Sequence, residues 1–495
     1  MALVSPVSAQ EATGAVTGRV QNAVEGKALN LARVAVAGTN RDLLTDDFGE
    51  YRFTGLPAGE VTLTVSYTGL QTQSIKVTIV AGQTVTADAS LASAAVARSL
   101  GEDSAVTLDA FVVTSERETN AANIAANEQR YSSNLKNVVS SDAFGDVTEG
   151  NIGEFMKFLP GVSVDYVAAD VRTMAVRGFA DNFTSVSVNG ARMASSASGG
   201  SSRSFEFEQV SINNVARIEI SKAPTPSMPA DSLGGAVNMI SKNAFERKGT
   251  QFKYRAYLSL NSEDLQIFKK TAGPMGEKTF KGLPGFDFDL TIPFSKTFGI
   301  VVTGLTSNQF NEQHRTQNVY NHAQAGATAA NPYLQQYLFQ DGPKNTFRDS
   351  VSIKADWKLA PGHVLSASWQ TNYYLSQFGN RNYNFNVGTS NTSTPSGGVP
   401  LSYNASSVTG AGGRGTLTGE MSFRDKYGLT NASVIGYKYT GERWQVDAGV
   451  NYSASKTWYR DAGRGHFSSV RTSLIGINRI SYEGITEERP TTIRA

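Results

Sequence analysis

The stretch FRDSVSIKADWKL, residues 347–359, decides the fold of the larger part of this chain. Apolar residues take every second place in it, at Val351, Ile353, Ala355 and Trp357, and polar or charged residues stand between them. Successive side chains of a strand point to opposite faces, so the stretch predicts a strand with one apolar and one polar face. The same alternation recurs at residues 286–295, 365–373 and 444–452.

The connections between these strands alternate in length. Strands of about ten residues with aromatic side chains near their ends, joined alternately by short turns and long loops, are typical of a transmembrane β-barrel. A soluble β-sandwich is the alternative, but it gives no reason for the turn lengths to alternate. Short turns are expected at 295–298, 360–363 and 440–443, and long polar segments near 263–284, 311–346 and 380–428.

Residues 250–495 are therefore predicted to form part of an antiparallel transmembrane β-barrel. We expect about seven or eight strands, the last beginning near Phe467. Barrels wide enough to hold a plug have ~22 strands, for which this segment has no room. The fold class expected here is thus an incomplete barrel, in a chain that is the N-terminal part of a longer protein.

The composition agrees with a mainly β protein. The chain has 495 residues, of which 47 are Gly, 18% are charged and 10% are aromatic, whereas long helical bundles are richer in charged residues and alanine. A net charge of +2 gives no reason to expect a nucleic acid as partner. The absence of Cys excludes disulfides and thiol chemistry, and no metal site is expected with only 4 His. There is no apolar run of ~18 residues, so no transmembrane helix is predicted.

Residues 1–13 include a short stretch that is similar to a signal-peptidase site. They lack the basic start and the full apolar core of a complete secretory signal. We interpret them as the remnant of a clipped or misannotated secretory signal. An unstructured cytosolic start is the alternative, and these residues alone leave it open.

Residues 14–91 predict a small β-sandwich, because short β-branched runs follow one another between Gly, Asn, Asp and Pro turns. Asp46, Asp47 and Gly49 suit a tight turn, after which Tyr51 and Phe53 point to one face of a strand. These residues and the L-P-A-G turn at 56–59 resemble the carboxypeptidase-regulatory-like β-sandwich, which is not catalytic in that family. A calcium site at the two Asp residues is a weaker interpretation than turn formation.

Residues 92–129 are predicted to be a linker with one short strand on it. A β-prone run without a neighbouring strand offers its backbone to a partner's sheet edge, and the alternative is a strand that returns to the sandwich. The run consists of Leu108, Asp109, Ala110, Phe111, Val112, Val113 and Thr114.

Residues 130–243 mix short helices and strands, as expected of an α/β domain. The helix predicted at 151–159 carries an apolar face and an N-cap at Asn151. It is followed by L-P-G-V, R-G-F, a strand ending in N-G, then R-I-E and G-G-x-x-N. In this order the motifs resemble the plug domain of TonB-dependent outer-membrane receptors. Their residues are Pro160, Gly161, Arg177, Gly178, Phe179, Asn189, Gly190, Arg217, Ile218, Glu219, Gly234, Gly235 and Asn238.

The resemblance implies that residues 108–114 are a TonB box. The implied partners are TonB, with ExbB and ExbD in the inner membrane, outer-membrane lipid, and a small extracellular ligand. The implied function is energy-coupled uptake across the outer membrane of a Gram-negative-type bacterium, with the N-terminal domain in the periplasm and no cofactor. The family's usual D-G turn is Asn189-Gly190 here, and its R-G-P segment is replaced at 222–230, so local conformation cannot be transferred there.

Charged residues of the plug motifs suggest a further role. Arg177, Arg217 and Glu219 are candidates for paired, buried charges between the plug and the barrel wall, and the alternative is that they only hold the plug together. Gly234 and Gly235 are expected to permit a tight turn or a close backbone approach.

Two segments of the plug are candidates for ligand contact, since in the resembled plugs they reach the extracellular side. They are 180–184 and 192–204, with hydrogen-bonding groups that suit a hydroxyl-rich or anionic ligand. The alternative for the second segment is a loop without such a role. The candidate residues are Asp181, Asn182, Phe183, Arg192 and Arg203.

A siderophore, cobalamin, an oligosaccharide or a metal chelate would all suit the resembled fold. The regulatory-type sandwich is common in glycan-importing relatives, which slightly favours carbohydrate. A surface adhesin or structural β-protein is the runner-up function, although it needs neither a tethered strand nor ordered plug motifs. An enzyme is not expected, because the four His are scattered; His314 and His322 share a predicted loop and are a weak candidate for touching a ligand's metal.

Overall fold

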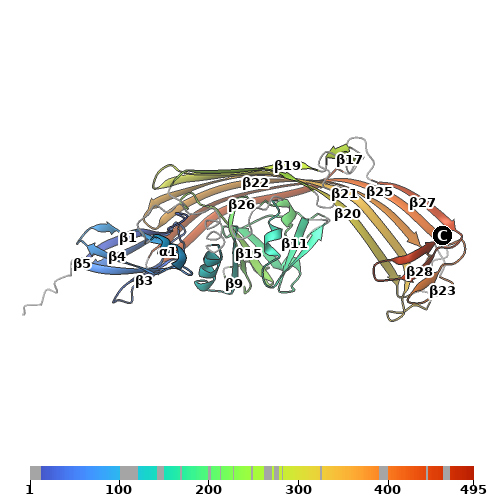
Figure 1. The fold of residues 1–495 in the computed structure, drawn as a ribbon, viewed down its shortest axis with the longest axis horizontal. Coiled ribbons are helices and arrows are strands. Elements are labelled where there is room, and N and C mark those ends of the chain that lie inside the picture. Colours follow the sequence, from blue (N-terminus) through green and yellow to red (C-terminus); the bar gives the residue numbers. More distant parts are fainter. Residues whose placement is uncertain are drawn as a thin grey trace, which may run out of the picture.

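The computed structural model describes residues 13–100, 121–141, 150–167, 170–198, 202–211, 213–226, 228–246, 249–260, 270–272, 278–280, 282–323, 326–388, 400–441, 444–460 and 469–495. A β-sandwich comes first, a plug of mixed structure follows, and a long curved sheet completes the chain (Figure 1). The predicted mainly β fold class, with sandwich, α/β plug and the first strands of an incomplete antiparallel barrel, is confirmed. Residues 1–12 and the predicted TonB box at 108–114 lie outside the described residues.

Two four-stranded sheets make the sandwich. One holds β4 (Glu50–Pro57), β1 (Thr13–Asn22), β7 (Thr84–Thr86) and β8 (Ala89–Leu91), and the other holds β3 (Asp42–Leu44), β2 (Arg33–Val36), β5 (Gly59–Ser66) and β6 (Gln73–Ile79). Their facing side chains form one buried cluster that includes Val16, Val34, Phe53 and Leu63. The burial of this apolar area is the main force that holds the two sheets together.

The turn before β4 has the predicted chemistry. Gly49 has φ +73°, which a side chain would strain, and Asp46 accepts hydrogen bonds from the backbone N–H of Phe48 and of Glu50, each at 2.9 Å. Tyr51 and Phe53 are both buried on the sandwich side, and the Tyr51 hydroxyl donates to the Ala87 carbonyl at 2.5 Å.

The predicted linker is partly helical. Residues Ala94–Leu100 form helix α1, and residues 121–130 form a second helix that packs on the sandwich. Asn127 on this second helix accepts from the Thr68 hydroxyl at 2.9 Å and donates to the Leu31 carbonyl at 2.9 Å. Neither helix was predicted within the linker, because packing against a surface that the sequence pattern does not reveal stabilises them.

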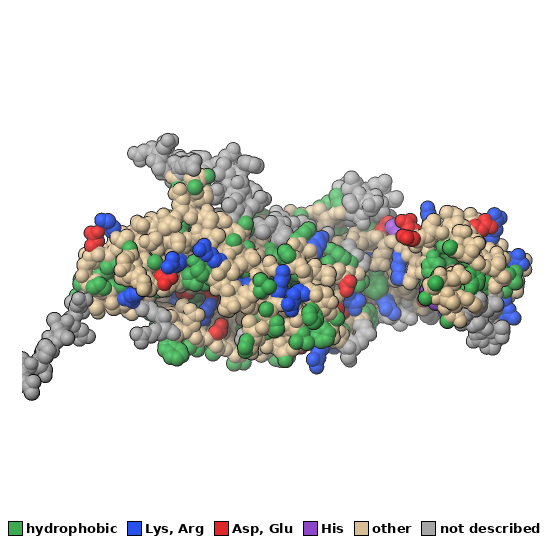
Figure 2. Space-filling model, turned by 90° about the horizontal axis from the view of Figure 1, so that it is seen from below, with side chains coloured by type: hydrophobic (Ala, Val, Ile, Leu, Met, Phe, Trp, Pro, Cys, Tyr) green, Lys and Arg blue, Asp and Glu red, His purple; other side chains and the backbone are tan. Residues whose placement is uncertain are grey.

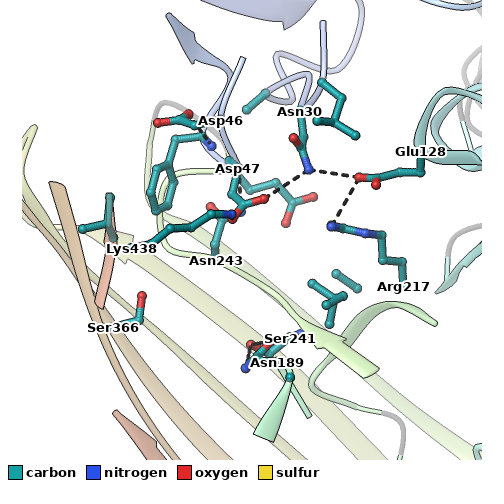
Figure 3. Close-up of a pocket in the computed structure, with 18 of the residues that line it drawn as sticks. Asn30, Asp46, Asp47, Glu128, Asn189, Arg217, Ser241, Asn243, Ser366 and Lys438 are labelled. Carbon is teal, nitrogen blue, oxygen red and sulfur yellow. Dashed lines mark hydrogen bonds and ion pairs between the residues drawn. The ribbon is translucent and has the colours of Figure 1, made fainter. Parts of the chain in front are cut away.

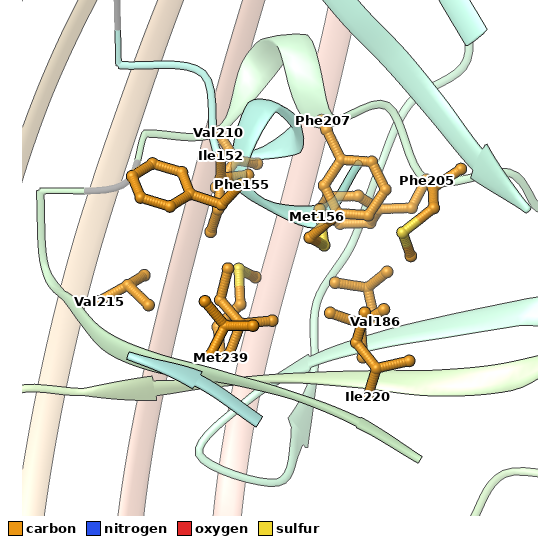
Figure 4. Close-up of a cluster of buried hydrophobic side chains, with 14 of the residues drawn as sticks. Ile152, Phe155, Met156, Val186, Phe205, Phe207, Val210, Val215, Ile220 and Met239 are labelled. Atoms are coloured by element: carbon orange, nitrogen blue, oxygen red, sulfur yellow. The ribbon is translucent and has the colours of Figure 1, made fainter. Parts of the chain in front are cut away.

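The plug is built on a five-stranded sheet and a separate hairpin. The sheet order is β13 (Ala191–Arg192), β12 (Thr184–Val188), β15 (Gly235–Ser241), β14 (Val215–Ser221) and β9 (Lys136–Ser140), and the hairpin pairs β10 (Val162–Val167) with β11 (Asp170–Val176). Helix α3 (Gly153–Met156) and the short 3-10 helices η2 (Asp181–Phe183) and η3 (Phe207–Gln209) complete it. Their apolar side chains meet in one core on one side of the sheet, in which Ile152, Phe155 and Met156 face Val215 and Met239 of the sheet strands (Figure 4).

The helix predicted at 151–159 is shorter than expected. Only Gly153–Met156 is α-helical, and its N-cap is Ile152 rather than Asn151. Asn151 instead accepts a bond from the Gly153 N–H at 2.8 Å and donates to the Val171 carbonyl at 3.1 Å. The predicted apolar face is nevertheless buried, since tertiary packing fixes it even where the helix is only one turn long.

The third part is an eight-stranded antiparallel sheet that arches over the plug (Figure 1). Its order is β16 (Gln251–Ser259), β19 (Leu283–Pro293), β20 (Phe298–Asn321), β21 (Tyr333–Ala360), β22 (His363–Asn386), β25 (Gly415–Thr440) and β26 (Gln445–Tyr459), with β27 (Ser469–Ile477) also paired to β25. The predicted strand length of about ten residues was wrong, because β20, β21, β22 and β25 have 24, 28, 24 and 26 residues. The expected loop at 311–346 is mostly strand: polar residues there continue the ladder beyond the apolar stretch.

Two small sheets complete the fold. Strands β17 (Lys270–Ala272) and β18 (Lys278–Phe280) pair with each other, and β23 (Ser402–Tyr403), β24 (Ser407–Thr409), β28 (Ser481–Ile485) and β29 (Pro490–Arg494) form a sheet at the far end. Figure 2 shows apolar side chains scattered in small groups over the face seen from below, and the plug exposes large apolar residues such as Leu135, Phe158 and Leu233. Within the described part of the chain, no helix is long and apolar enough to cross a membrane.

Candidate functional site

The tip of the plug hairpin is bound to the concave face of the sheet by buried charges. Asp170, at the start of β11, is 1% exposed and accepts from the Lys344 ammonium at 2.8 Å and from the Arg348 guanidinium. Burial alone would raise the pKa of Asp170, but Arg348 and Lys344 lower it to about 2. A carboxylate of this kind is stable in the interior only while both cations stay beside it.

A second charged group lies beside η3. Glu206 pairs with Arg172 of the plug at 2.8 Å and with Lys426 of β25 at 3.4 Å, and Glu208 contacts the same Lys426 ammonium. Burial would raise the pKa of Glu206, yet Lys426 and the Ser198 hydroxyl lower it. Plug and sheet are thus joined by shared ions rather than by an apolar seam.

Polar groups continue this interface towards the short turns of the sheet. The Ser350 hydroxyl donates to the Asn213 amide at 2.9 Å, and Asn214 donates to Gln370. Lys242 pairs with Asp289 at 2.6 Å, and the Ala244 N–H donates to Asp356 at 2.9 Å. Hydrogen-bonded interfaces of this kind hold a defined position but can be exchanged for water when the plug moves.

A cavity of about 590 Å³ lies where the sandwich, the helix at 121–130, the plug and the sheet meet (Figure 3). Its walls carry a chain of polar contacts that joins all four elements. Lys438 of β25 donates to Asp47 at 2.7 Å, and the Asn30 amide donates to both Asp47 at 3.1 Å and Glu128 at 3.0 Å. Glu128 in turn pairs with Arg217 of β14 at 3.3 Å.

The electrostatics of this junction follow from burial and pairing. Burial alone would lower the pKa of Arg217, but Glu128 and Glu219 raise it, so the guanidinium stays charged. Burial raises the pKa of Glu128, which Arg217 offsets only in part. Burial would raise the pKa of the Asp47 carboxyl, but Lys438 and Arg217 lower it. The junction therefore depends on ions that remain close together.

The predicted buried charges lie elsewhere than expected. Arg177 is exposed, has φ +57°, and donates to the Gly234 carbonyl at 3.2 Å, so it is not buried between plug and wall. Arg217 and Glu219 are partly buried and pair with each other at 3.1 Å, but they face the helix at 121–130 instead of the sheet. The placement between plug and wall was wrong, because strand alternation gives a side chain's face without naming the element that covers it. The alternative, that these charges hold the plug together, agrees with their contacts.

The remaining plug motifs shape the backbone. Asn189 has φ +49° and Gly190 φ +80°, and the Asn238 amide accepts from the Gly190 N–H at 2.8 Å. At Gly235 an added Cβ would stand 2.9 Å from the Ser221 carbonyl oxygen, so a close backbone approach requires glycine there. The turn residues Gly161 and Gly178 also have positive φ, Pro160 precedes the first of them, Phe179 is exposed, and Ile218 is buried in the plug core.

The structure brings together only some of the predicted ligand contacts. Arg192 and Arg203 both line a cavity of about 220 Å³ with Ser195 and Ser202, and Arg192 also pairs with Asp231 at 2.5 Å. Asp181, Asn182 and Phe183 form η2, outside the lining of this cavity.

Sequence reasoning missed the residues that bind the plug to the sheet. Asp170, Glu206 and Glu208 carried no motif, although each is an acidic residue in an otherwise apolar or small-residue neighbourhood. Among the described residues, no group of three or more His, Asp or Glu could hold a metal ion. His314 is exposed on β20, and His363 contacts the Tyr437 hydroxyl at 2.6 Å.

Comparisons with known proteins agree with this architecture. Residues 15–92 match the family described as Carboxypeptidase regulatory-like domain, and residues 128–236 match the one described as TonB-dependent Receptor Plug Domain. Both resemblances drawn from the sequence are therefore confirmed. No curated protein sequence matches the chain.

Several solved structures are similar to parts of the chain. The siderophore receptor PirA from Acinetobacter baumannii is 11% identical with a TM-score of 0.30, covering 68% of this chain and 59% of its own. A ferric enterobactin receptor from Pseudomonas aeruginosa is 11% identical with a TM-score of 0.35, and the match covers 72% of this chain and 56% of that receptor. The unliganded ferric citrate transporter FecA is 11% identical with a TM-score of 0.31, covering 73% and 62%. The chain thus spans less than two thirds of the length of these structures.

Proposed function

We propose that this chain, which carries a TonB-dependent receptor plug domain behind a carboxypeptidase regulatory-like domain, is part of an outer-membrane receptor for energy-coupled uptake of a scarce extracellular ligand into the periplasm. One observation carries the proposal: the plug is docked by buried, paired charges on the polar face of a sheet whose opposite face is apolar. A plug held by ions inside a membrane wall has to be moved for a ligand to pass.

The apolar outer face of the sheet supports a location of the sheet in the lipid bilayer. Side chains that contact the plug and those of the outer face alternate along each strand, as in β21, where Ser350 contacts Asn213 while Val351 is exposed. Exposed apolar residues in such a band match the lipid-facing surface of a membrane barrel. The exposed residues of this face are Phe286, Val351, Ile353, Trp357, Leu359, Trp369, Ile435, Val446 and Val450.

The contacts of the sandwich support its placement on the periplasmic side of the membrane. In bacterial barrels the short turns face the periplasm, and the sandwich contacts the sheet at that end. Lys358, just before the turn after β21, pairs with Glu50 at 2.6 Å, and Lys438, near the end of β25, pairs with Asp47 at 2.7 Å. Helix α1 and the helix at 121–130, which flank the predicted box in the sequence, are both described, and the second packs on the sandwich through Asn127.

The buried ion pairs explain why energy would be required. Separating one partner from a buried pair costs roughly 3–5 kcal/mol, since it leaves a charge without compensation. Asp170 and Glu206 each contact two cations, so thermal motion alone seldom frees the plug. In the proposed mechanism, TonB, driven by ExbB and ExbD, adds a strand to residues 108–114 and pulls on the adjoining helix.

Arg192 and Arg203 are the proposed plug contacts of the ligand, because they line the same cavity. Replacing both with Ala should weaken ligand binding in cells with equal receptor levels. Lys157→Ala removes an exposed plug charge elsewhere and is the matched control.

Binding of the box to TonB tests the proposed function. A synthetic peptide of residues 105–118 should bind the periplasmic domain of TonB from the same bacterium, and the Val112→Pro peptide should bind more weakly, because proline removes a ladder donor. If boxes of other receptors bind that domain while the 105–118 peptide does not, the proposed coupling is wrong.

A further inference from the structure

The sandwich contacts the chain where it enters the plug. Asn127, on the helix at 121–130, accepts from the Thr68 hydroxyl and donates to the Leu31 carbonyl, each at 2.9 Å. The Asn127 side chain is buried by these contacts, and Ile124 on the same helix packs against the apolar core of the sandwich. We call this set of interactions the entry contact.

The same sandwich also holds the chain where it leaves the plug. The Ala28 N–H donates to the Glu246 carbonyl at 2.8 Å, and the Arg19 guanidinium donates to the Phe245 carbonyl at 2.6 Å. Phe48 meets Phe245 edge to face, with their ring centroids 5.4 Å apart. Because Phe245 and Glu246 follow β15 and precede β16, they join the plug to the sheet. We call this second set the exit contact.

The exit contact is fixed to the short-turn end of the sheet. The Lys358 ammonium of β21 lies 4.7 Å from the ring centroid of Phe48 and 4.3 Å from that of Phe245. It also pairs with Glu50 at 2.6 Å, and the two Phe side chains are buried in one apolar cluster with Val301 of β20. Cation–π attraction, an ion pair and apolar burial therefore act together here. The entry contact depends mainly on neutral hydrogen bonds, whose net gain is small because water replaces them.

The first plug strand after the helix is an edge strand. Within the described residues, β9 pairs with β14 alone and ends the five-stranded order of the plug sheet. Glu128 on the helix pairs with Lys136 of β9 at 3.6 Å and with Arg217 of β14 at 3.3 Å. Tension from the box would act on the helix first and on β9 next, since this is their order along the chain. An edge strand can leave a sheet while the other strands stay paired.

We infer that the sandwich is a clamp on the plug, with a releasable entry contact and a fixed exit contact. Tension on the box opens the entry contact before β9 leaves the plug sheet. The exit contact meanwhile keeps the other end of the plug at the short-turn end of the sheet, so the plug opens from β9 and stays attached. This inference rests on the proposed function, which supplies the tension, and gives the sandwich a role in it.

Introduced thiols can test the clamp, because the chain has no Cys. Val139 of β9 is buried in the plug core. In the full-length receptor, Val139→Cys should therefore react with a fluorescent maleimide only when β9 leaves the sheet. Labelling is compared at equal receptor abundance in cells with and without induced TonB, and TonB should make it faster.

Cross-links then separate the two contacts. Thr68→Cys with Asn127→Cys places a thiol pair across the entry contact, and Ala28→Cys with Glu246→Cys places the matched pair across the exit contact. A short bis-maleimide joins each pair and consumes its thiols before TonB is induced, while Val139→Cys is still buried. Joining the entry pair should abolish the TonB-dependent labelling of Val139→Cys. Joining the exit pair should leave that labelling as it is without a pair.

Asn127→Ala weakens the clamp without a cross-link. It removes two hydrogen bonds of the entry contact, so TonB-dependent labelling of Val139→Cys should become about tenfold faster. Gln129→Ala is the matched control, because Gln129 is an exposed amide on the same helix and donates to the Ala125 carbonyl of that helix. This control should leave the labelling rate unchanged.

TonB-dependent labelling that continues after the entry pair is joined, or that stops equally when the exit pair is joined, would overturn the inference. An unchanged rate in Asn127→Ala, or labelling that never depends on TonB, would overturn it too. The proposed function is judged separately by the 105–118 peptide. A peptide that binds TonB, together with labelling that ignores the entry cross-link, would leave the receptor function standing and remove the clamp.

Discussion

The Asp170 carboxylate, at the tip of the plug hairpin, lies 2.8 Å from the Lys344 ammonium of β21, and both side chains are almost fully buried. The Arg348 guanidinium, four positions further along β21, contacts the same carboxylate. The plug is thus anchored to the wall at a point where water cannot replace a lost partner.

Replacing Asp170 with Asn should loosen the hairpin. The variant leaves Lys344 and Arg348 without their counter-ion, which costs roughly 3–5 kcal/mol. Hydrogen exchange of residues 162–176 should become faster in the receptor held in membranes or detergent. The control is Asp165→Asn, an exposed carboxylate of the same hairpin, which should leave exchange unchanged. Equal protection in the Asp170 variant and the wild type contradicts the anchoring role.

Acid should weaken the same contact within a defined range. Since the pKa of Asp170 in the folded protein is lowered from 3.8 to about 2, its charge stabilises the docked plug above about pH 4, and this contribution is lost as the pH falls towards 2. The difference amounts to about 2 kcal/mol. Hydrogen exchange of β10 and β11, corrected for intrinsic rates, should therefore lose protection between pH 4 and pH 2. The Asp170→Asn variant should lack that pH-dependent step, and a step of equal size in it would contradict the assignment.

Glu128 is expected to connect the helix after the box to the plug. Glu128→Gln weakens its pairing with Arg217 and with Lys136, at a cost of roughly 1–3 kcal/mol for a buried group left poorly satisfied. The helix at 121–130 should then be cleaved faster by a protease. Arg130→Gln, an exposed charge on the same helix, is the matched control. Identical cleavage rates for Glu128→Gln and the control would show that this contact does not hold the helix.

Much of the fold was predictable because its signal is local. Val351 and Ile353 alternate with polar residues inside a single strand, and that pattern alone gives the two faces of the sheet. Strand length was not predictable, since polar residues interrupt the apolar alternation in residues 333–345, whose place in the ladder is set by partners on β20 and β22.

The site was less predictable than the fold. Asp170 and Lys344 are 174 positions apart, so no spacing rule connects them before the plug is docked. Arg217 was correctly singled out as a charge that needs a partner, but the partner is Glu128 on a helix that the sequence pattern had assigned to the linker. The backbone conformation of the plug motifs with glycine was easier to predict, because a positive φ is a property of one residue and its turn.

Tryptophan fluorescence should locate the sheet in the membrane. Trp369 lies roughly 20 Å along β22 from the short turn, whereas Trp357 and Trp444 lie near the short-turn ends of β21 and β26, and all three are exposed on the outer face. In single-Trp variants, lipids brominated deep in the acyl chains should quench Trp369 more than Trp357 or Trp444. Equal quenching at all three positions, or none, contradicts the proposed lipid-facing surface.

The measurement that tests the central claim most directly is cross-linking to TonB in growing cells. A photoreactive phenylalanine analogue at Phe111, in the predicted box, should form an adduct with TonB, and the adduct should increase when the ligand is present. The same analogue at Val450, on the outer face of β26, should give none. An adduct at Phe111 that depends on TonB is the result predicted for an energy-coupled receptor. The absence of any TonB adduct at 108–114, in cells where another receptor's box does cross-link, would contradict it.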